Sequence, residues 1–267
     1  MTRSELHALI RAKQSFLCVG LDTDPNKLPD HLVGDPQGVL KFNKAIIEAT
    51  LPYTVSYKLN IAFYEAMGVE GWQILEQTLA LIPEGEAFII ADAKRGDIGN
   101  TAAQYAKAFY HTFGCDAVTV NPYMGEDSLT PFLNDQGKWA IALGLTSNKG
   151  AQDIELLELK NGQYVFEAAI ARMAELGSDE NLMFVVGATQ PAFFERIREV
   201  APRHFLLIPG VGAQGGQLKD LQTLLTDDIG VLVNSSRMII YASQSEDFAS
   251  AARDEAARLQ QDMAAML

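Results

Sequence analysis

Eight short apolar runs alternate with helix-like segments along this chain of 267 residues. The runs are rich in β-branched residues, and most are continuously apolar, as expected of strands that are covered on both faces. They span residues 16–21, 55–59, 87–91, 117–120, 139–145, 182–187, 205–208 and 230–233. The helix-like segments span residues 37–50, 69–81, 99–112, 163–176, 190–199, 215–225 and 244–266. This alternation predicts an α/β protein with a closed parallel (β/α)8 barrel, the TIM-barrel fold.

The chain also shows no internal division. Barrels of this kind commonly fill about 250 residues, and no linker rich in Pro, Gly or Ser interrupts the sequence. We therefore predict a single TIM-barrel domain over residues 1–267. The stretch 146–162 is longer than a usual connection, and we expect it to be a mobile or binding loop.

Composition narrows the classes of partner. The chain has 21 Lys and Arg against 34 Asp and Glu, a formal net charge of −13. Such a surface repels phosphate backbones, so we expect no nucleic-acid partner. No stretch approaches the roughly 20 apolar residues that span a bilayer, and we expect a cytoplasmic protein without membrane contact. Cys18 and Cys115 stand singly in apolar surroundings, which predicts two buried free thiols.

Polar residues cluster where the apolar runs end. They are Asp22, Lys58, Asp92 with Lys94, Asn121, Ser147, Thr189 with Gln190, Gln214, and Ser235 with Arg237. In a (β/α)8 barrel the C-terminal strand ends meet at one mouth, where barrel enzymes carry out their chemistry. Any one of these residues could be a helix cap or a turn residue, but eight such ends together favour an active site.

The hexapeptide DAKRGD, which begins at Asp92, carries the strongest chemical signal. Asp92 and Lys94 are two apart at a strand end, so we expect them to point to the same side. Asp97 follows in the next turn. Carboxylates beside an ammonium keep it protonated, which makes Lys94 a proton donor next to fixed negative charge. The simpler interpretation is a surface salt bridge at a helix start, but Lys58 and Asp22 at the preceding strand ends favour catalysis.

The glycine-rich segment PGVGAQGG at 209–216 follows the seventh apolar run. Its glycines expose backbone N–H groups, and the helix expected after it adds a positive N-terminus, so the segment suits a phosphate. One strand later, Arg237 can grip the same anion with its guanidinium. Two alternatives stay open. One is the GxGxxG spacing of dinucleotide-binding folds, for which too little chain follows; the other is a plain tight turn.

Metal chemistry finds little support in the sequence. The four histidines are scattered without metal-ligand spacing, and neither a serine-hydrolase nor a P-loop motif occurs. A carboxylate metal site built from Asp22 and Asp92 would be crowded by the positive charges of Lys58 and Lys94. We therefore expect no metal.

Seven motifs occur in an order that points to one family. They are GLDTDP at 20–25, YKLNIAFYEA at 57–66, DAKRGDIGNTA at 92–102, NPYMG at 121–125, LTSNKG at 145–150, PGVGAQGG at 209–216 and NSSR at 234–237. On these motifs the chain resembles orotidine 5′-phosphate decarboxylase over nearly its whole length. With FNKAIIEAT at 42–50, it is similar to the longer-chain subgroup common in some bacteria. The resemblance implies a carboxy-lyase that makes UMP in the last step of de novo pyrimidine biosynthesis, with no cofactor.

The resemblance also implies a role for each site residue. The implied substrate contacts are Asp22 and Lys58 to the ribose hydroxyls, Ser147 to the pyrimidine edge, and Gln214, Gly216 and Arg237 to the phosphate. The implied catalytic residues are Lys58, Asp92, Lys94 and Asp97, a charged array in which Lys94 stabilises and protonates the C6 carbanion. Asp97 and Thr101 would reach into the neighbouring subunit's site, because the family's enzymes are homodimers with shared active sites.

Two other functions stay open. A sister barrel that uses DxKxxD for sugar-phosphate chemistry, such as keto-gulonate phosphate decarboxylase or hexulose phosphate synthase, shares the central motif. Those barrels use Mg²⁺ and a carboxylate at the second strand, where this chain has Lys58. A catalytically silent nucleotide-binding barrel would act as a sensor or scaffold and bind UMP without turnover. The intact set of charged residues disfavours it.

Overall fold

The computed structural model describes residues 1–211 and 215–267, and all eight predicted strands are present. They are β1 (Leu17–Gly20), β2 (Ser56–Asn60), β3 (Phe88–Arg95), β4 (Ala117–Val120), β5 (Trp139–Leu145), β6 (Leu182–Val186), β7 (Phe205–Pro209) and β8 (Val231–Ser235). They follow one another, in sequence order, around a closed barrel. The pairings of β1 with β2, of β2 with β3, and of β4 through β7 are parallel. The predicted (β/α)8 barrel is confirmed.

Helices alternate with these strands. They are α1 (Arg3–Lys13), α2 (Gly38–Thr50), α3 (Ile61–Glu65), α4 (Gly68–Ala80), α5 (Gly99–Lys107), α6 (Glu126–Leu133), α7 (Val165–Ala174), α8 (Phe194–Val200), α9 (Arg237–Ile240) and α10 (Phe248–Ala264). A π-helical turn, Ala108–Thr112, continues α5. Short 3₁₀ helices occupy Pro25–Lys27, Asp30–Leu32, Leu51–Tyr53, Pro122–Met124, Lys149–Asp153, Pro191–Phe193 and Leu218–Leu224.

Backbone contacts divide the chain into two compact units. One comprises residues 1–4 and 94–233, and the other comprises residues 5–93 and 234–267. We call them the central unit and the terminal unit. The single domain over residues 1–267 stays a prediction.

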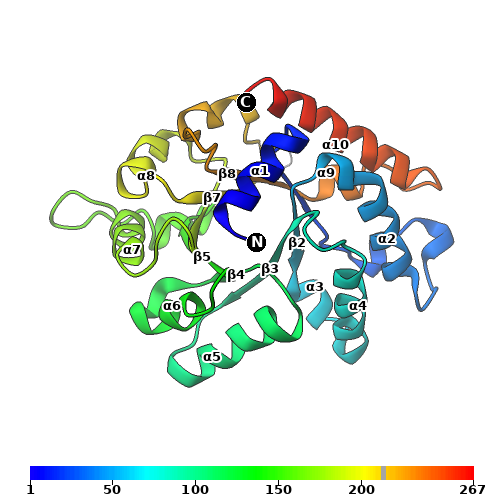
Figure 1. The fold of residues 1–267 in the computed structure, drawn as a ribbon, viewed down its shortest axis with the longest axis horizontal. Helices are drawn as coiled ribbons and strands as arrows, with labels where there is room; N and C mark the ends of the chain where they lie inside the picture. The colour runs from blue at the N-terminus through cyan, green and yellow to red at the C-terminus, as the bar shows by residue number, and fades with distance from the viewer. Residues whose placement is uncertain (212–214) are drawn as a thin grey trace. The chain divides into compact units, whose positions relative to one another are not determined.

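In the terminal unit, α10 packs beside α2 and α9 (Figure 1). The ring of Phe42 on α2 stacks on that of Phe248 at the start of α10, with 5.0 Å between their centroids. Burial of these aromatic rings is a large apolar contribution to the stability of the unit. On the sheet, the register aligns Lys58 with Ile90 and Asn60 with Asp92. The C-terminal end of β2 therefore lies beside Asp92 in the second half of β3.

In the central unit, α5 packs against α6 and α7 against α8, outside the strands (Figure 1). All four residues of β4 and all five of β6 are buried, which explains why β6 is apolar throughout and why Thr119 is the one polar residue of β4. The register aligns Thr119 of β4 with Ile141 of β5.

Near the start of β7, a buried arginine ties several loops together. The Arg198 guanidinium donates to the carbonyls of Leu224, Gly230, Ala201 and His204. Burial is the main reason that the pKa of Arg198 falls to about 10.

In the central unit, two helix assignments differ from expectation. Helix α6 was not predicted, because Pro131 inside it and Gly125 before it both signal a break. The α-helix predicted over 215–225 is wrong: the described part of that segment forms the 3₁₀ helix Leu218–Leu224. Its leucines recur at intervals of three, a spacing that aligns side chains on one face of a 3₁₀ helix, and Leu221 and Leu224 are fully buried.

The two cysteines are buried free thiols, as predicted. Burial raises the pKa of Cys18 and of Cys115 to about 12, so neither forms a thiolate near neutral pH. Over residues 1–211 and 215–267, none of the helices has the length and apolar character needed to traverse a bilayer.

Candidate active site

Three charged residues predicted for the site come together in the terminal unit, at the ends of β1, β2 and β3. The Lys58 Nζ lies 2.8 Å from Oδ2 of Asp92 and 3.4 Å from Oδ1 of Asp22. Lys58 is 4% exposed and Asp92 is 8% exposed. The strand register accounts for the contact, because Lys58 and Asp92 extend from neighbouring C-terminal strand ends.

Electrostatics keeps this lysine charged. Burial alone lowers the pKa of Lys58, but the carboxylates of Asp22 and Asp92 outweigh it and raise that pKa overall. The cluster is therefore an ammonium held between two carboxylates and largely shielded from water. Such an arrangement presents fixed charges to a ligand without reorganisation.

The segment after β8 folds against β1 within the same unit. The Cys18 thiol donates to Oδ1 of Asn234, and the Asn234 amide donates to Oγ of Ser236 over 3.3 Å. Gly20 permits this approach, since a Cβ there would collide with the Ser236 hydroxyl. Arg237 then begins α9 with its side chain exposed.

In the central unit, Lys94 lies near the end of β3 with φ of 46°, in the left-handed region. Its amide donates to Oγ1 of Thr119 on β4, over 2.9 Å. Strand alternation, from which Asp92 and Lys94 are predicted to point to one side, does not apply at Lys94, because its backbone leaves the extended conformation. The Lys94 side chain is exposed.

Asp97 and Thr101 follow in the same unit, on the connection from β3 into α5. Oδ1 of Asp97 accepts from the amide of Ile98 over 2.8 Å, and the carboxylate is half-buried. Thr101 is exposed in the first turn of α5. Neighbouring Asn121, predicted at the end of β4, accepts from the amide of Tyr123 and so serves as a turn residue.

Ser147 lies just beyond β5, where the backbone is held from several sides. Gly187 approaches it so closely that a Cβ at Gly187 would lie 2.7 Å from the Ser147 nitrogen. The carboxylate of Glu155 accepts from both the amide and the hydroxyl of Thr146, at 2.7 and 2.8 Å. The side chains of Thr189 and Gln190 donate to the carbonyls of Ser147 and Thr146, respectively.

Two residues that hold the backbone of the site, Glu155 and Thr119, were not predicted from the sequence. Glu155 lies inside the long 146–162 segment, where its charge looks like ordinary solvent exposure. From the sequence, Thr119 is not distinguished from the other β-branched residues of a buried strand. Only the three-dimensional arrangement assigns partners to them.

The glycine-rich segment after β7 is described in part. Gln214 lies outside the described residues. The Gly216 amide donates to the carbonyl of Gly210 over 3.2 Å, and a Cβ at Gly216 would collide with Ala188. The predicted contribution of an α-helix N-terminus is wrong, since the helix that follows is the 3₁₀ helix Leu218–Leu224.

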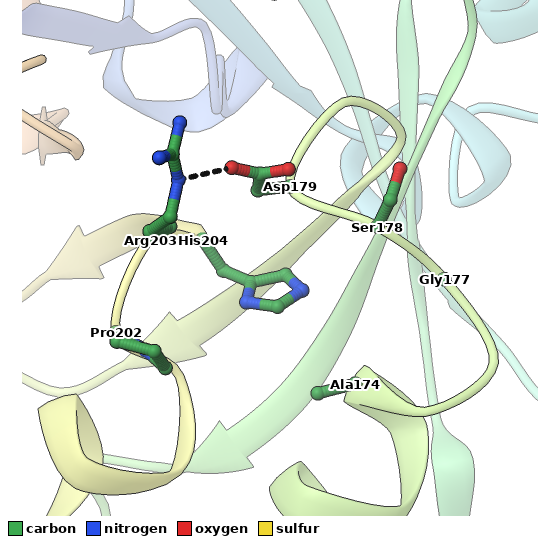
Figure 2. Close-up of a pocket in the computed structure, with 7 residues that line it drawn as sticks. All are labelled: Ala174, Gly177, Ser178, Asp179, Pro202, Arg203 and His204. Atoms are coloured by element: carbon green, nitrogen blue, oxygen red, sulfur yellow. Dashed lines mark hydrogen bonds and ion pairs between the residues drawn. The ribbon is translucent and has the colours of Figure 1, made fainter.

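A separate hollow in the central unit has a cavity volume of about 360 Å³. Figure 2 shows its lining, with the His204 ring between Ala174 and the Asp179–Arg203 ion pair. These residues precede β6 and β7, whereas Ser147 and Gln190 follow the C-terminal ends of β5 and β6. The hollow is therefore at the opposite ends of the strands from the predicted chemistry.

Comparisons with known proteins agree with the resemblance seen in the motifs. The family model described as "Orotidine 5'-phosphate decarboxylase / HUMPS family" matches residues 15–253. Proteins named orotidine 5′-phosphate decarboxylase from Bacteroides fragilis and Phocaeicola vulgatus are each 53% identical to the chain. The first match covers 100% of this chain and 98% of the relative, and the second covers 98% of each.

A solved structure of Leishmania donovani OMP decarboxylase is also similar, with a TM-score of 0.80 and 34% identity. That match covers 98% of this chain and 99% of the solved one. The predicted family is confirmed, and with it the class of enzyme, a carboxy-lyase: this chain belongs to the orotidine 5′-phosphate decarboxylase / HUMPS family.

Proposed function

We propose that this enzyme converts orotidine 5′-phosphate (OMP) to UMP, the last step of de novo pyrimidine biosynthesis, without a cofactor. The observation that carries the proposal is the buried ammonium of Lys58 between Asp22 and Asp92. The sister sugar-phosphate barrels have a carboxylate at the second strand. A lysine there favours the OMP branch of the family.

The chemistry needs an electrostatic partner for a carbanion. When the bond between C6 and the carboxyl group breaks, CO2 leaves and the electron pair stays on C6 as a vinyl carbanion. The Lys94 ammonium stabilises this charge and transfers a proton from Nζ to C6. The neutral amine then regains a proton from water. Asp92 lies near the departing carboxylate and Asp97 completes the charged array.

Substrate contacts follow the order of the strand ends. Asp22 and Lys58 hold the ribose hydroxyls, Ser147 hydrogen-bonds the pyrimidine edge, and Gln214, Gly216 and Arg237 bind the phosphate. The exposed guanidinium of Arg237 supports this role, because it is accessible to an anion. Phosphate binding far from C6 supplies energy to close the 146–162 loop and exclude water.

The working form is a homodimer with shared active sites, in which Asp97 and Thr101 reach into the partner's site. Support comes from large apolar side chains exposed on two connections of the central unit, the one after β3 that holds Asp97 and the one after β4. Ile98 is 51% exposed, Met124 is 48% exposed and Tyr123 is 81% exposed. Apolar surface of this kind is typical of a surface that a partner covers. The cytoplasmic location and the absence of nucleic-acid binding stay predictions.

The test is conversion of OMP by purified protein after EDTA treatment, followed by loss of OMP absorbance and by chromatography of the product. Cofactor-free decarboxylation predicts undiminished formation of UMP. Loss of activity that Mg²⁺ restores would favour a sister sugar-phosphate barrel. Binding of UMP without any turnover would favour the silent nucleotide-binding barrel.

A further inference from the structure

Lys94 has a backbone conformation that a lysine rarely adopts. Its φ of 46° lies in the left-handed region, where the Cβ of an ordinary residue crowds the following carbonyl. Among the described residues, the other non-glycine residues with positive φ are Gln14 and Ile229. Neither belongs to the predicted site. Strain of this kind persists where the surrounding structure fixes it, and it gathers at functional positions.

Strand β4 and the residue that follows it hold the backbone at Lys94 and Arg95. The Lys94 amide donates to Oγ1 of Thr119 over 2.9 Å, and the carbonyl of Arg95 accepts from the amide of Asn121 over 2.7 Å. In a regular parallel ladder, a strand amide pairs with a backbone carbonyl of its neighbour. At Lys94 a side-chain hydroxyl takes that place, so the amide is satisfied in the left-handed conformation.

Thr119 is well suited to hold this position. It is 1% exposed in a strand whose other residues, Ala117, Val118 and Val120, are apolar. A valine would fill almost the same space, but it could not accept the hydrogen bond. The Lys94 amide is part-buried, and loss of this hydrogen bond would destabilise the conformation that depends on it.

We infer that Thr119 is a positioning residue for the proposed reaction: its hydroxyl holds Lys94 in the left-handed conformation that directs the ammonium to C6. The inference rests on the proposed decarboxylation. If the backbone at Lys94 relaxed to an extended conformation, its side chain would leave the strand in another direction. A displacement of about 1 Å at a reacting group can reduce the rate about 100-fold.

The test compares Thr119→Val with Thr119→Ser, which keeps the hydroxyl. We expect Thr119→Val to lower kcat by about 10- to 100-fold while KM for OMP and the affinity for UMP change less than about threefold. Thr119→Ser should keep kcat within about threefold of the unchanged enzyme. The matched control is Thr50→Val, which likewise removes a buried threonine hydroxyl; the Thr50 hydroxyl donates to the carbonyl of Ile46. This control variant should leave kcat unchanged.

Hydrogen exchange at the Lys94 amide supplies a readout that does not depend on turnover. We expect slow exchange in the unchanged enzyme and in Thr119→Ser, and faster exchange in Thr119→Val. A normal kcat in Thr119→Val overturns the inference, and so does fast exchange in the unchanged folded enzyme, a result that needs no variant to fold. If the unchanged enzyme fails to decarboxylate OMP, the proposed function fails, and exchange alone decides whether Thr119 holds Lys94.

Discussion

The Lys58 ammonium lies 2.8 Å from Oδ2 of Asp92, with both side chains more than 90% shielded from solvent. Burial of this ion pair costs free energy. Removal of either charge leaves the other buried without a counter-charge, which strongly destabilises the fold. The presence of this cluster, which also includes Asp22, is therefore better explained by the proposed ligand binding and catalysis than by a contribution to fold stability. In the proposed reaction it presents an ordered set of charges to the substrate.

Replacement of Lys58 tests this dependence. Lys58→Met should lower the free energy of unfolding by about 3 kcal/mol, since it leaves Asp92 buried without its counter-charge. The double variant Lys58→Met with Asp92→Asn should recover a large part of that loss. Urea unfolding of the three proteins measures both effects. Equal stability of the single and double variants would contradict the coupling.

The left-handed backbone at Lys94 gives a prediction about stability alone. Glycine normally lowers stability relative to alanine by about 0.5–1 kcal/mol. At a φ of 46° the order should reverse, with Lys94→Gly more stable than Lys94→Ala by about 1 kcal/mol. Both variants lose the same charge, so their difference in urea unfolding isolates the backbone. A more stable alanine variant would show that no such strain exists.

His204 should make stability depend on pH. Burial is the main reason that its pKa falls below the usual value; Arg3 and Arg198 also lower it, and Asp179 opposes them. The folded state then binds fewer protons than the unfolded state, so stability falls as pH drops below about 6.5. The largest slope from one such group is about 1.4 kcal/mol per pH unit.

The measurement is urea unfolding at pH 7.5, 6.5 and 5.5. His204→Phe, which keeps a ring beside Phe184, should flatten the decline on the acid side. His31→Gln, at an exposed position, is the control and should leave the decline intact. An unchanged slope in His204→Phe would assign the pH dependence to other groups.

Mixed dimers test the proposed shared site. Lys94→Ala and Asp97→Ala homodimers should each be inactive, because every site lacks one charged group. After subunit exchange, a hybrid contains one site with both defects and one intact site, so activity should return to at most about half per hybrid dimer. The measurement is OMP turnover before and after exchange. Absence of recovery, with exchange verified by mass, would place both residues in one chain's own site.

The strands were predictable from sequence because burial on both faces leaves a direct trace, an uninterrupted apolar run such as Trp139–Leu145. The polar residues that follow those runs could be placed at the strand ends for the same reason. Of these, Lys58 does contact Asp22 and Asp92. Helix α6 was missed because local breaking signals at Pro131 are overridden by packing.

The left-handed backbone conformation at Lys94 could not be predicted from the sequence, for a different reason. The prediction that side chains alternate along β3 assumes an extended strand. The residue types around Lys94 do not indicate a left-handed conformation at that position. The hydrogen bond from Lys94 to Thr119 joins residues 25 positions apart on two strands. Such a contact depends on register, which single-sequence patterns do not define.

The most direct measurement is turnover of OMP by Lys94→Ala, together with its affinity for UMP. Loss of the proton donor should lower kcat by at least about 1,000-fold, while the dissociation constant for UMP stays within about tenfold of that of the unchanged enzyme. Such a split would place Lys94 in the chemical step rather than in binding. Retained turnover in Lys94→Ala would contradict the account and remove this ammonium as the source of the C6 proton.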